Sequence, residues 1–106
     1  MSAILIADSG STKTEWCLLE DNKKKKFITA GLSPYFVSAG QAKQIIEQDV
    51  YAKIKNKLPA AVYFYGTGCS NPVNVKMLNG VLKQVFPKAK IQVDHDLMGA
   101  ARSLCG

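Results

Sequence analysis

The spacing of apolar and polar positions along the chain predicts five strands and three helices. Apolar runs of strand length occur at 3–7, 15–20, 25–30, 60–65 and 89–93. Apolar residues recur at helical spacing over about 39–57 and 72–86, and a run of small residues at 97–105 predicts a third helix. The expected order is therefore strand, strand, strand, helix, strand, helix, strand, helix.

Capping residues support the first two helices. Ser38 followed by Gln41 matches a capping box, in which each side chain satisfies an N–H group at the helix start. Asn71 before Pro72 is typical of an N-cap followed by proline at the first helical position. The apolar stripe of the first helix repeats every four residues, at Ala42, Ile46, Val50 and Ile54. These signals predict two amphipathic helices, each stopped by a proline.

The connections between the elements decide the fold class. Three strands joined by short turns are expected to form an antiparallel meander, and the later strands return through helices in right-handed crossovers. This gives an α/β fold, with a mixed five-stranded sheet and helices on both faces. A chain of 106 residues has room for one such core, so residues 1–106 are expected to form one domain.

Composition indicates a soluble globular protein, with 47% hydrophobic and 21% charged residues. No apolar run approaches the ~20 residues that a membrane-spanning helix needs. The run Ile4-Leu5-Ile6 is also too short for the apolar part of a signal peptide. We therefore expect a cytoplasmic location and no membrane partner.

The net charge of +6 alone would suggest a nucleic-acid partner, but the distribution of the charge does not. Four of the 14 basic residues form the run Lys23–Lys26, which contains no aromatic residue on which a base could stack. A lysine run beside a hairpin favours solubility and protects an edge strand. No nucleic-acid partner is expected.

The three cysteines, Cys17, Cys69 and Cys105, are far apart and form no C-x-x-C pair. This spacing argues against a zinc ribbon and against a disulfide framework. Isolated cysteines are usually small buried hydrophobic residues, and all three are interpreted in that way. A metal cluster shared between two chains stays open as an alternative.

Candidate chemistry begins at the turn Asp8-Ser9-Gly10-Ser11-Thr12-Lys13-Thr14. Glycine permits a sharp turn and the close approach of a ligand. Hydroxyl groups, backbone N–H groups and the Lys13 cation could hold a phosphate, and Asp8 is placed to hold Mg²⁺ directly or through water. An ordinary hairpin turn also uses Asp, Ser and Gly, so this pattern alone leaves both interpretations open.

Two further polar loops are expected at the same edge as this turn. The loop 66–71, with Gly66, Thr67, Gly68 and Ser70, follows the fourth strand, and residues 94–96 follow the fifth. Ligands of open α/β sheets bind outside the carboxyl ends of the strands. The glycines could admit a sugar or acyl group close to the backbone, although a strand-to-helix loop needs them for its geometry as well.

Asp96 is the candidate catalytic base. A carboxylate beyond a strand end can accept the proton of a hydroxyl group that attacks a γ-phosphate. Asp96 also precedes a predicted helix, where capping alone would explain it. Asp94 is the alternative base, and His95 between them is left unassigned.

These residues resemble a known group of proteins. The sequence from Asp8 to Thr14 is similar to the first phosphate motif, D-x-G-x-T-x-T, of the actin-like ATPase superfamily, which includes sugar kinases and actin. Residues 6–16, 31–34 and 96–101 also resemble segments of the BadF/BadG/BcrA/BcrD-type ATPases and N-acetylglucosamine kinases. The resemblance spans essentially the whole chain and implies the ribonuclease H-like half-domain of that superfamily.

The resemblance also implies roles for individual residues. Asp8 would lie near Mg²⁺, and Gly10, Ser11, Thr12, Lys13 and Thr14 near the β- and γ-phosphates of ATP. Asp96 would take the proton from the 6-hydroxyl of N-acetylglucosamine. The segments 66–70 and 32–35 would border the sugar, although Pro34 and Tyr35 stand where other kinases of the group place polar sugar contacts.

The same resemblance predicts that this chain is only the N-terminal half of such a kinase. The adenosine site, the second phosphate loop and the hinge would lie in a C-terminal half that the chain lacks. The chain alone should then be inactive, and its exposed cleft face could drive formation of a homodimer. Two other functions stay open: an ATP-driven activator of a dehydratase with a bridging iron–sulfur cluster, and a non-catalytic nucleotide-binding domain.

Overall fold

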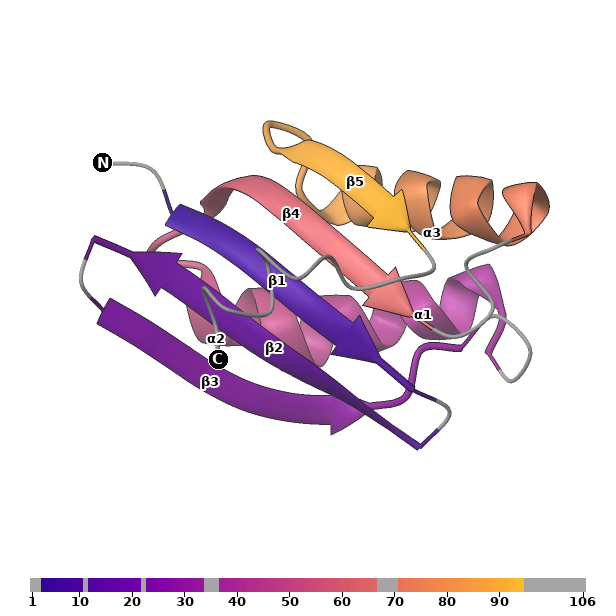
Figure 1. Ribbon diagram of the computed structural model, residues 1–106, viewed down its shortest axis with the longest axis horizontal. Helices are drawn as coiled ribbons and strands as arrows, with labels where there is room; N and C mark the ends of the chain where they lie inside the picture. Colours follow the sequence, from indigo (N-terminus) through magenta and orange to yellow (C-terminus); the bar gives the residue numbers. More distant parts are fainter. Residues whose placement is uncertain (1–2, 11, 22, 34–36, 67–70, 95–106) are drawn as a thin grey trace.

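The computed structural model describes residues 3–10, 12–21, 23–33, 37–66 and 71–94. In this part of the chain, five strands form one sheet in the order β3-β2-β1-β4-β5 (Figure 1). The strands are β1 (Ala3–Ser9), β2 (Lys13–Glu20), β3 (Lys23–Ala30), β4 (Pro59–Gly66) and β5 (Lys90–Asp94). The pairs β1–β2 and β2–β3 are antiparallel, whereas β1–β4 and β4–β5 are parallel. The predicted meander and mixed five-stranded sheet are confirmed.

The first three strands are longer than the apolar runs alone predicted. β1 continues through Asp8 to Ser9, and β2 begins at Lys13, because the ladder between them reaches the pair Ser9–Thr14. β3 begins at Lys23, so the lysine run is part of an edge strand and not of the preceding turn. Backbone hydrogen bonding therefore extends each strand beyond its apolar run, and Asp8 lies inside a strand.

The first helical segment is α-helical at its ends and π-helical in the middle. It consists of α1 (Ala39–Ile45), η1 (Ile46–Tyr51) and α2 (Ala52–Ile54). A stripe that repeats every four residues would drift around an α-helix of 3.6 residues per turn. The i→i+5 hydrogen bonds of a π segment enclose more residues per turn, which keeps such a stripe on one face. All four stripe residues are buried, with at most 2% of their surface exposed.

The helix starts follow the predicted caps. Gln41 N–H donates to Ser38 Oγ at 3.2 Å, and Ser38 N–H donates to Gln41 Oε1 at 2.9 Å, which completes the capping box. At the start of α3 (Pro72–Val85), Asn71 Oδ1 accepts from Val73 N–H at 2.8 Å. The first segment ends at Ile54, earlier than the predicted residue 57, in a turn that Lys57 N–H closes on the Ile54 carbonyl.

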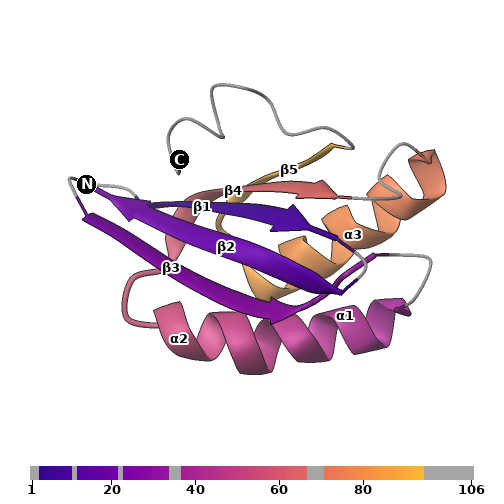
Figure 2. The same cartoon turned by 60° about the horizontal axis from the view of Figure 1, so that its bottom comes forward.

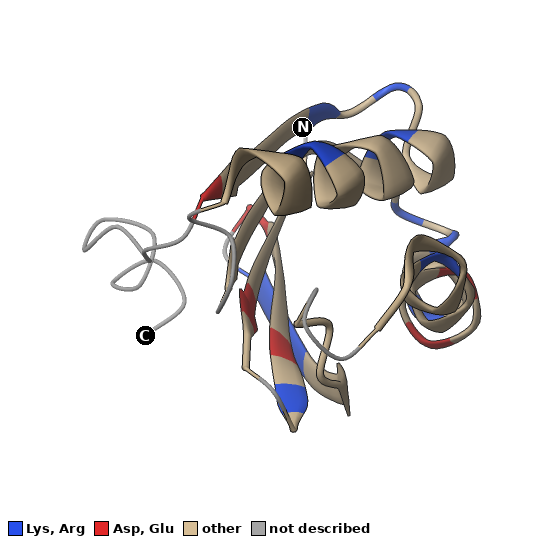
Figure 3. Cartoon of the chain, turned by 90° about the vertical axis from the view of Figure 1, so that its right-hand side faces the viewer, with Lys and Arg blue, Asp and Glu red and all other residues tan. Residues whose placement is uncertain are grey.

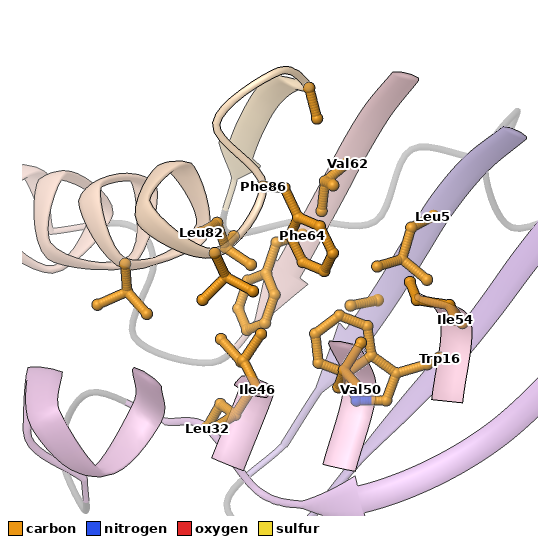
Figure 4. Packing of buried hydrophobic residues seen from close by; sticks show 14 of the residues in the cluster. Leu5, Trp16, Leu32, Ile46, Val50, Ile54, Val62, Phe64, Leu82 and Phe86 are labelled. Atoms are coloured by element: carbon orange, nitrogen blue, oxygen red, sulfur yellow. The ribbon is translucent and has the colours of Figure 1, made fainter. Parts of the chain in front are cut away.

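Both helical segments of the described chain cover the same face of the sheet (Figure 2). The core between them and the sheet is one cluster, which includes Leu5, Trp16, Val62, Phe64 and Leu82 (Figure 4). Trp16 is 1% exposed, stacks on Phe27 and meets Phe64 edge-on. The run 97–105, for which a third helix is expected, lies outside the described residues.

The opposite face of the sheet carries a small second cluster. Ile6 and Tyr65 are buried there, and Ile4, Leu19 and Tyr63 pack against them. Cys17 is a buried free cysteine, as predicted, whereas Cys69 and Cys105 lie outside the described residues. None of the helices in the described ranges is long and apolar enough to cross a membrane.

Candidate functional site

Three strand ends meet at one edge of the sheet, as the sequence predicted. The last residues of β1 and β4, Ser9 and Gly66, are register partners, and Asp94 at the end of β5 is the partner of Tyr65. Figure 3 looks onto this edge of the molecule, with the acidic positions of the strands in red. The turn after β1 therefore begins at the same edge of the sheet at which β4 and β5 end.

The turn between β1 and β2 is tight. Gly10 N–H donates to the Lys13 carbonyl at 2.8 Å, and Gly31 N–H donates to the Thr12 carbonyl at 3.2 Å. The backbone angle φ of Gly10 is not in the left-handed region, and an added Cβ would make only an ordinary contact of 3.6 Å with Lys13 O. The backbone at position 10 therefore does not require glycine, and the close approach of a ligand to Gly10 stays a prediction.

The hydroxyl groups of Ser9 and Thr14 lie beneath this turn and are fully engaged. The two hydroxyl oxygens are 2.8 Å apart, Thr14 Oγ1 donates to the Ala30 carbonyl at 3.0 Å, and Leu32 N–H donates to Ser9 Oγ at 3.0 Å. Thr14 is completely buried. In the described part of the turn, the exposed side chains are those of Thr12 and Lys13. Lys13 Nζ lies 4.0 Å from Glu15 Oε1.

Asp8 belongs to a row of polar residues across four strands. In register, Glu15 of β2 lies beside Asp8, Asp8 beside Tyr65 of β4, and Tyr65 beside Asp94 of β5. Asp8 and Asp94 are both partly exposed. No group of three or more His, Cys, Asp and Glu that could hold a metal ion occurs among the described residues. A cation here would therefore depend on one or two carboxylates and on oxygen atoms from elsewhere.

The pKa of the Tyr65 hydroxyl is raised above its usual value, chiefly because the side chain is buried, with the Asp94 and Tyr63 charges adding to the effect. The neutral phenol is thus favoured in the folded state. The stability that the neutral Tyr65 side chain contributes is therefore present below pH ~10, and it is lost as the pH rises through the pKa of the folded state.

Tyr65→Phe is therefore expected to flatten the loss of stability at alkaline pH. Urea unfolding at pH 8 and near pH 11 should show a smaller fall in the free energy of unfolding for Tyr65→Phe than for the wild type. Tyr51→Phe, on the helical segment and away from Asp94, is the control. An equal fall in the Tyr65→Phe and wild-type chains would contradict the expectation.

Gly66 is required by close packing at the site edge. An added Cβ would lie 3.2 Å from Phe64 Cε1, from Ser9 Cβ and from Ser9 O. The Ser9 backbone is fixed by the sheet, so it cannot move aside without disturbing the strand end from which the turn begins.

Gly66→Ala should accordingly destabilise the chain by about 1–3 kcal/mol, a typical penalty for overpacking. The matched control is Gly80→Ala, at an exposed position of α3 where an added Cβ meets nothing within 4 Å. This control should stabilise the chain by about 0.5–1 kcal/mol, because alanine is the better helix former. Urea unfolding measures the stability of both variants. Equal stability would contradict the expectation, because it would show that the contact between Ser9 and Gly66 adjusts to the added Cβ at no cost.

Ser33 is a feature that the sequence reasoning missed. Its side chain is 1% exposed, and its hydroxyl has no hydrogen-bond partner among the described residues. It follows Leu32, which is tied to Ser9, and its carbonyl accepts from Val37 N–H at 3.1 Å. Nothing in the sequence distinguishes this serine from Ser9, which has partners, because burial and hydrogen bonding depend on the tertiary structure.

Several predicted site residues lie outside the described residues. They are Ser11 between β1 and β2, Thr67, Gly68 and Ser70 after β4, and Asp96 after β5. His95, to which no role was assigned, also lies outside the described residues. The described residues that the fold brings to the common edge are Asp8, Gly10, Thr12, Lys13 and Gly66, with Asp94 beside them. The roles given to all of these residues stay predictions.

Comparison with known proteins first defines the class. YeaZ from Pseudomonas aeruginosa shares 18% identity with the chain, with a TM-score of 0.54, over 92% of this chain and 45% of that one. An uncharacterized Pseudomonas aeruginosa protein with similarity to peptidase YEAZ shares 17% identity, with a TM-score of 0.54, over 92% and 44%. At this identity the likeness concerns the fold alone. It agrees with the predicted α/β fold.

A third structure defines the family. A protein from Porphyromonas gingivalis, described as "Putative N-acetylglucosamine Kinase", shares 39% identity with the chain, with a TM-score of 0.77, over 97% of this chain. The chain spans 38% of the length of that relative. Protein-family models and curated proteins gave no match. The resemblance predicted from the sequence is confirmed: the chain corresponds to part of a protein of the N-acetylglucosamine kinase family.

Proposed function

We propose that the chain is the N-terminal part of an ATP-dependent sugar kinase that transfers the γ-phosphate to the 6-hydroxyl of N-acetylglucosamine. The observation that carries the proposal is the 39% identity with the Porphyromonas gingivalis relative over 97% of the chain. The common edge of β1, β4 and β5 supports it, because ligands of such sheets bind at the carboxyl ends of the strands.

In this proposal the described residues act on the phosphate side. Thr12 and Lys13 are exposed at the turn and would contact the β- and γ-phosphates, with Ser11 between Gly10 and Thr12. Gly10 would let the phosphate approach the backbone closely. This contact would explain the glycine at position 10, which the fold alone does not require. Thr14 would act from beneath the turn, since its hydroxyl is committed to Ala30.

Asp8 fits Mg²⁺ as a single carboxylate ligand. Mg²⁺ is usually held by one or two carboxylates together with substrate phosphates and water molecules, and needs no cage of protein ligands. Asp8 is partly exposed and lies one pleat before the turn, on the face that also carries Glu15 and Asp94. When bound, Mg²⁺ would neutralise charge on the phosphates, while Asp8 orients it and Lys13 adds a second cation.

The acceptor side of the proposed site is built from the loops after β4 and β5. Gly66, Thr67, Gly68 and Ser70 would border the sugar, and Asp96 would take the proton of the attacking hydroxyl. The chain alone would bind ATP weakly and transfer no phosphate, because the adenosine site is assigned to a C-terminal half of the kinase. The chain alone would also form a homodimer, through the cleft face that the C-terminal half of the kinase would cover.

A chimera tests the proposed function. The matching part of the Porphyromonas gingivalis relative is replaced by this chain, and ADP release is measured with and without N-acetylglucosamine. Release that depends on the sugar is the expected result, with glucose and buffer alone as controls. Release that ignores the sugar would contradict the kinase assignment.

A further inference from the structure

The hydrogen bonds beneath the first turn form a continuous chain. Leu32 N–H donates to Ser9 Oγ at 3.0 Å, and the hydroxyl oxygens of Ser9 and Thr14 are 2.8 Å apart, where either hydroxyl can be the donor. Thr14 Oγ1 also lies at hydrogen-bond distance, 3.0 Å, from the Ala30 carbonyl, and Ser9 Oγ lies 3.5 Å from the Gly10 carbonyl. Each hydroxyl group has a single proton, and both protons of this chain have acceptors within the protein.

This chain joins two segments that are far apart in sequence. Ser9 and Thr14 form the last pair of the β1–β2 ladder, immediately below residues 10–13, whereas Ala30 and Leu32 lie at and beyond the end of β3. Gly31 N–H adds a second link, to the Thr12 carbonyl. Residues 30–32 are thus tied to the turn by three hydrogen bonds, two to side chains beneath it and one to its own backbone.

Burial makes these bonds strong and specific. Ser9 is 3% exposed, and Thr14 and Leu32 are completely buried. In such a low-dielectric setting, hydrogen bonds in a chain reinforce one another, and removing one member leaves its neighbours buried without a partner. A displacement of the turn therefore moves residues 30–32 with it.

We propose that Ser9 and Thr14 are positioning residues, whose hydroxyl chain fixes residues 30–32 against the turn 10–13 and transmits nucleotide binding at the turn to the segment that begins at Ala30. The proposal rests on the proposed function in naming the nucleotide. It replaces a direct phosphate contact by Ser9 or Thr14, because both hydroxyl groups are buried and have acceptors within the protein. It also gives a physical link between the turn and Leu32, the first residue of the segment 32–35 that is expected to border the sugar.

Amide hydrogen exchange in the free 106-residue chain tests, without any ligand, whether the hydroxyl chain of Ser9 and Thr14 fixes residues 30–32. Ser9→Ala and Thr14→Val each remove one hydroxyl, and exchange at the Leu32 amide should become at least tenfold faster in both. Ser33→Ala is the matched control, since it removes a buried serine hydroxyl for which the described part of the chain offers no hydrogen-bond partner. Thr14→Ser keeps the hydroxyl and should retain the protection. Unchanged exchange at Leu32 in Ser9→Ala would overturn the proposal.

Titration with Mg·ADP, followed by backbone amide NMR, tests the transmission. In the wild type, the amides of Gly10 and Thr12 should shift together with those of Gly31 and Leu32. In Thr14→Val the turn should still respond while the shifts at 31–32 are lost, and Thr14→Ser should restore them. Persistent shifts at 31–32 in Thr14→Val would overturn the transmission. Because the free chain is proposed to bind nucleotide weakly, the titration is repeated in the chimeric kinase. A turn that ignores Mg·ADP in both proteins would contradict the proposed function and the transmission, and the exchange result would still decide whether the hydroxyl chain fixes residues 30–32.

Discussion

Asp96→Asn should reduce sugar-dependent ADP release by the chimeric kinase about 100-fold or more, without a comparable loss of stability. A positioned general base contributes about 10²–10⁴ in rate, and an amide cannot accept the proton of the attacking hydroxyl. Asparagine is as good an N-cap as aspartate. The substitution therefore removes the proposed base while keeping the capping function that would otherwise explain the residue. Initial rates at saturating ATP, together with urea unfolding, measure both effects.

Asp94→Asn is the matched control for this experiment. Asp94 is the last residue of β5 and the register partner of Tyr65, so its carboxylate belongs to the polar row on the sheet face. If Asp96 is the base, Asp94→Asn should retain most of the rate. The reverse result, with activity lost in Asp94→Asn and retained in Asp96→Asn, would transfer the role to Asp94. Equal, small losses in both variants would leave the proposed transfer without a carboxylate base in this segment.

The sheet could be predicted from the sequence because its strands carry strong local signals. The apolar run from Ala3 and the apolar and aromatic run before Gly66 identify two central strands, and short turns between the first three strands leave a meander as the simple arrangement. Caps at Ser38 and Asn71 were equally predictable, because a capping hydrogen bond involves residues only two or three positions apart.

The π-helical segment was not predicted, although the sequence contained a signal for it. Four buried residues at a strict spacing of four, from Ala42 to Ile54, do not fit 3.6 residues per turn. A stripe that repeats every four residues is also typical of an ordinary amphipathic helix, which is what the sequence predicts. Over the full stripe the drift accumulates, and the backbone accommodates it in η1.

The edge that holds the candidate site was predicted, but the roles of its hydroxyl groups were not. Spacing placed Ser9, Thr12 and Thr14 in one turn without showing which of them face the core. The ladder settles this, because Ser9 and Thr14 are a register pair on the helix-covered face, whereas Thr12 is exposed. Likewise, Gly10 and Gly66 both looked like flexible turn glycines. In the fold it is Gly66 that lacks room for a Cβ, since it faces Ser9 on the neighbouring strand.

Trp16→Ala should lower the free energy of unfolding by about 3–5 kcal/mol, the range for truncating a buried tryptophan. Trp16 is 1% exposed, and its Nε1–H donates to Thr29 Oγ1 at 2.9 Å. Its ring lies 6.2 Å from Phe27 and 6.1 Å from Phe64, measured between centroids. The loss would approach the whole stability of a marginal domain, which is about 5–15 kcal/mol.

Trp16→Phe separates the two parts of this effect. It keeps an aromatic ring between Phe27 and Phe64 but removes the hydrogen bond to Thr29, so a loss clearly smaller than that of Trp16→Ala is expected. Since Trp16 is the single tryptophan, unfolding is followed by circular dichroism. A loss under ~1 kcal/mol for Trp16→Ala would contradict the packing. Trp16 lies two residues after Thr14 on the same strand. If Trp16→Ala lowers the free energy of unfolding strongly, amide exchange at Leu32 should therefore also become faster. Such a result would show that the hydroxyl chain of Ser9 and Thr14 depends on the packing of the core.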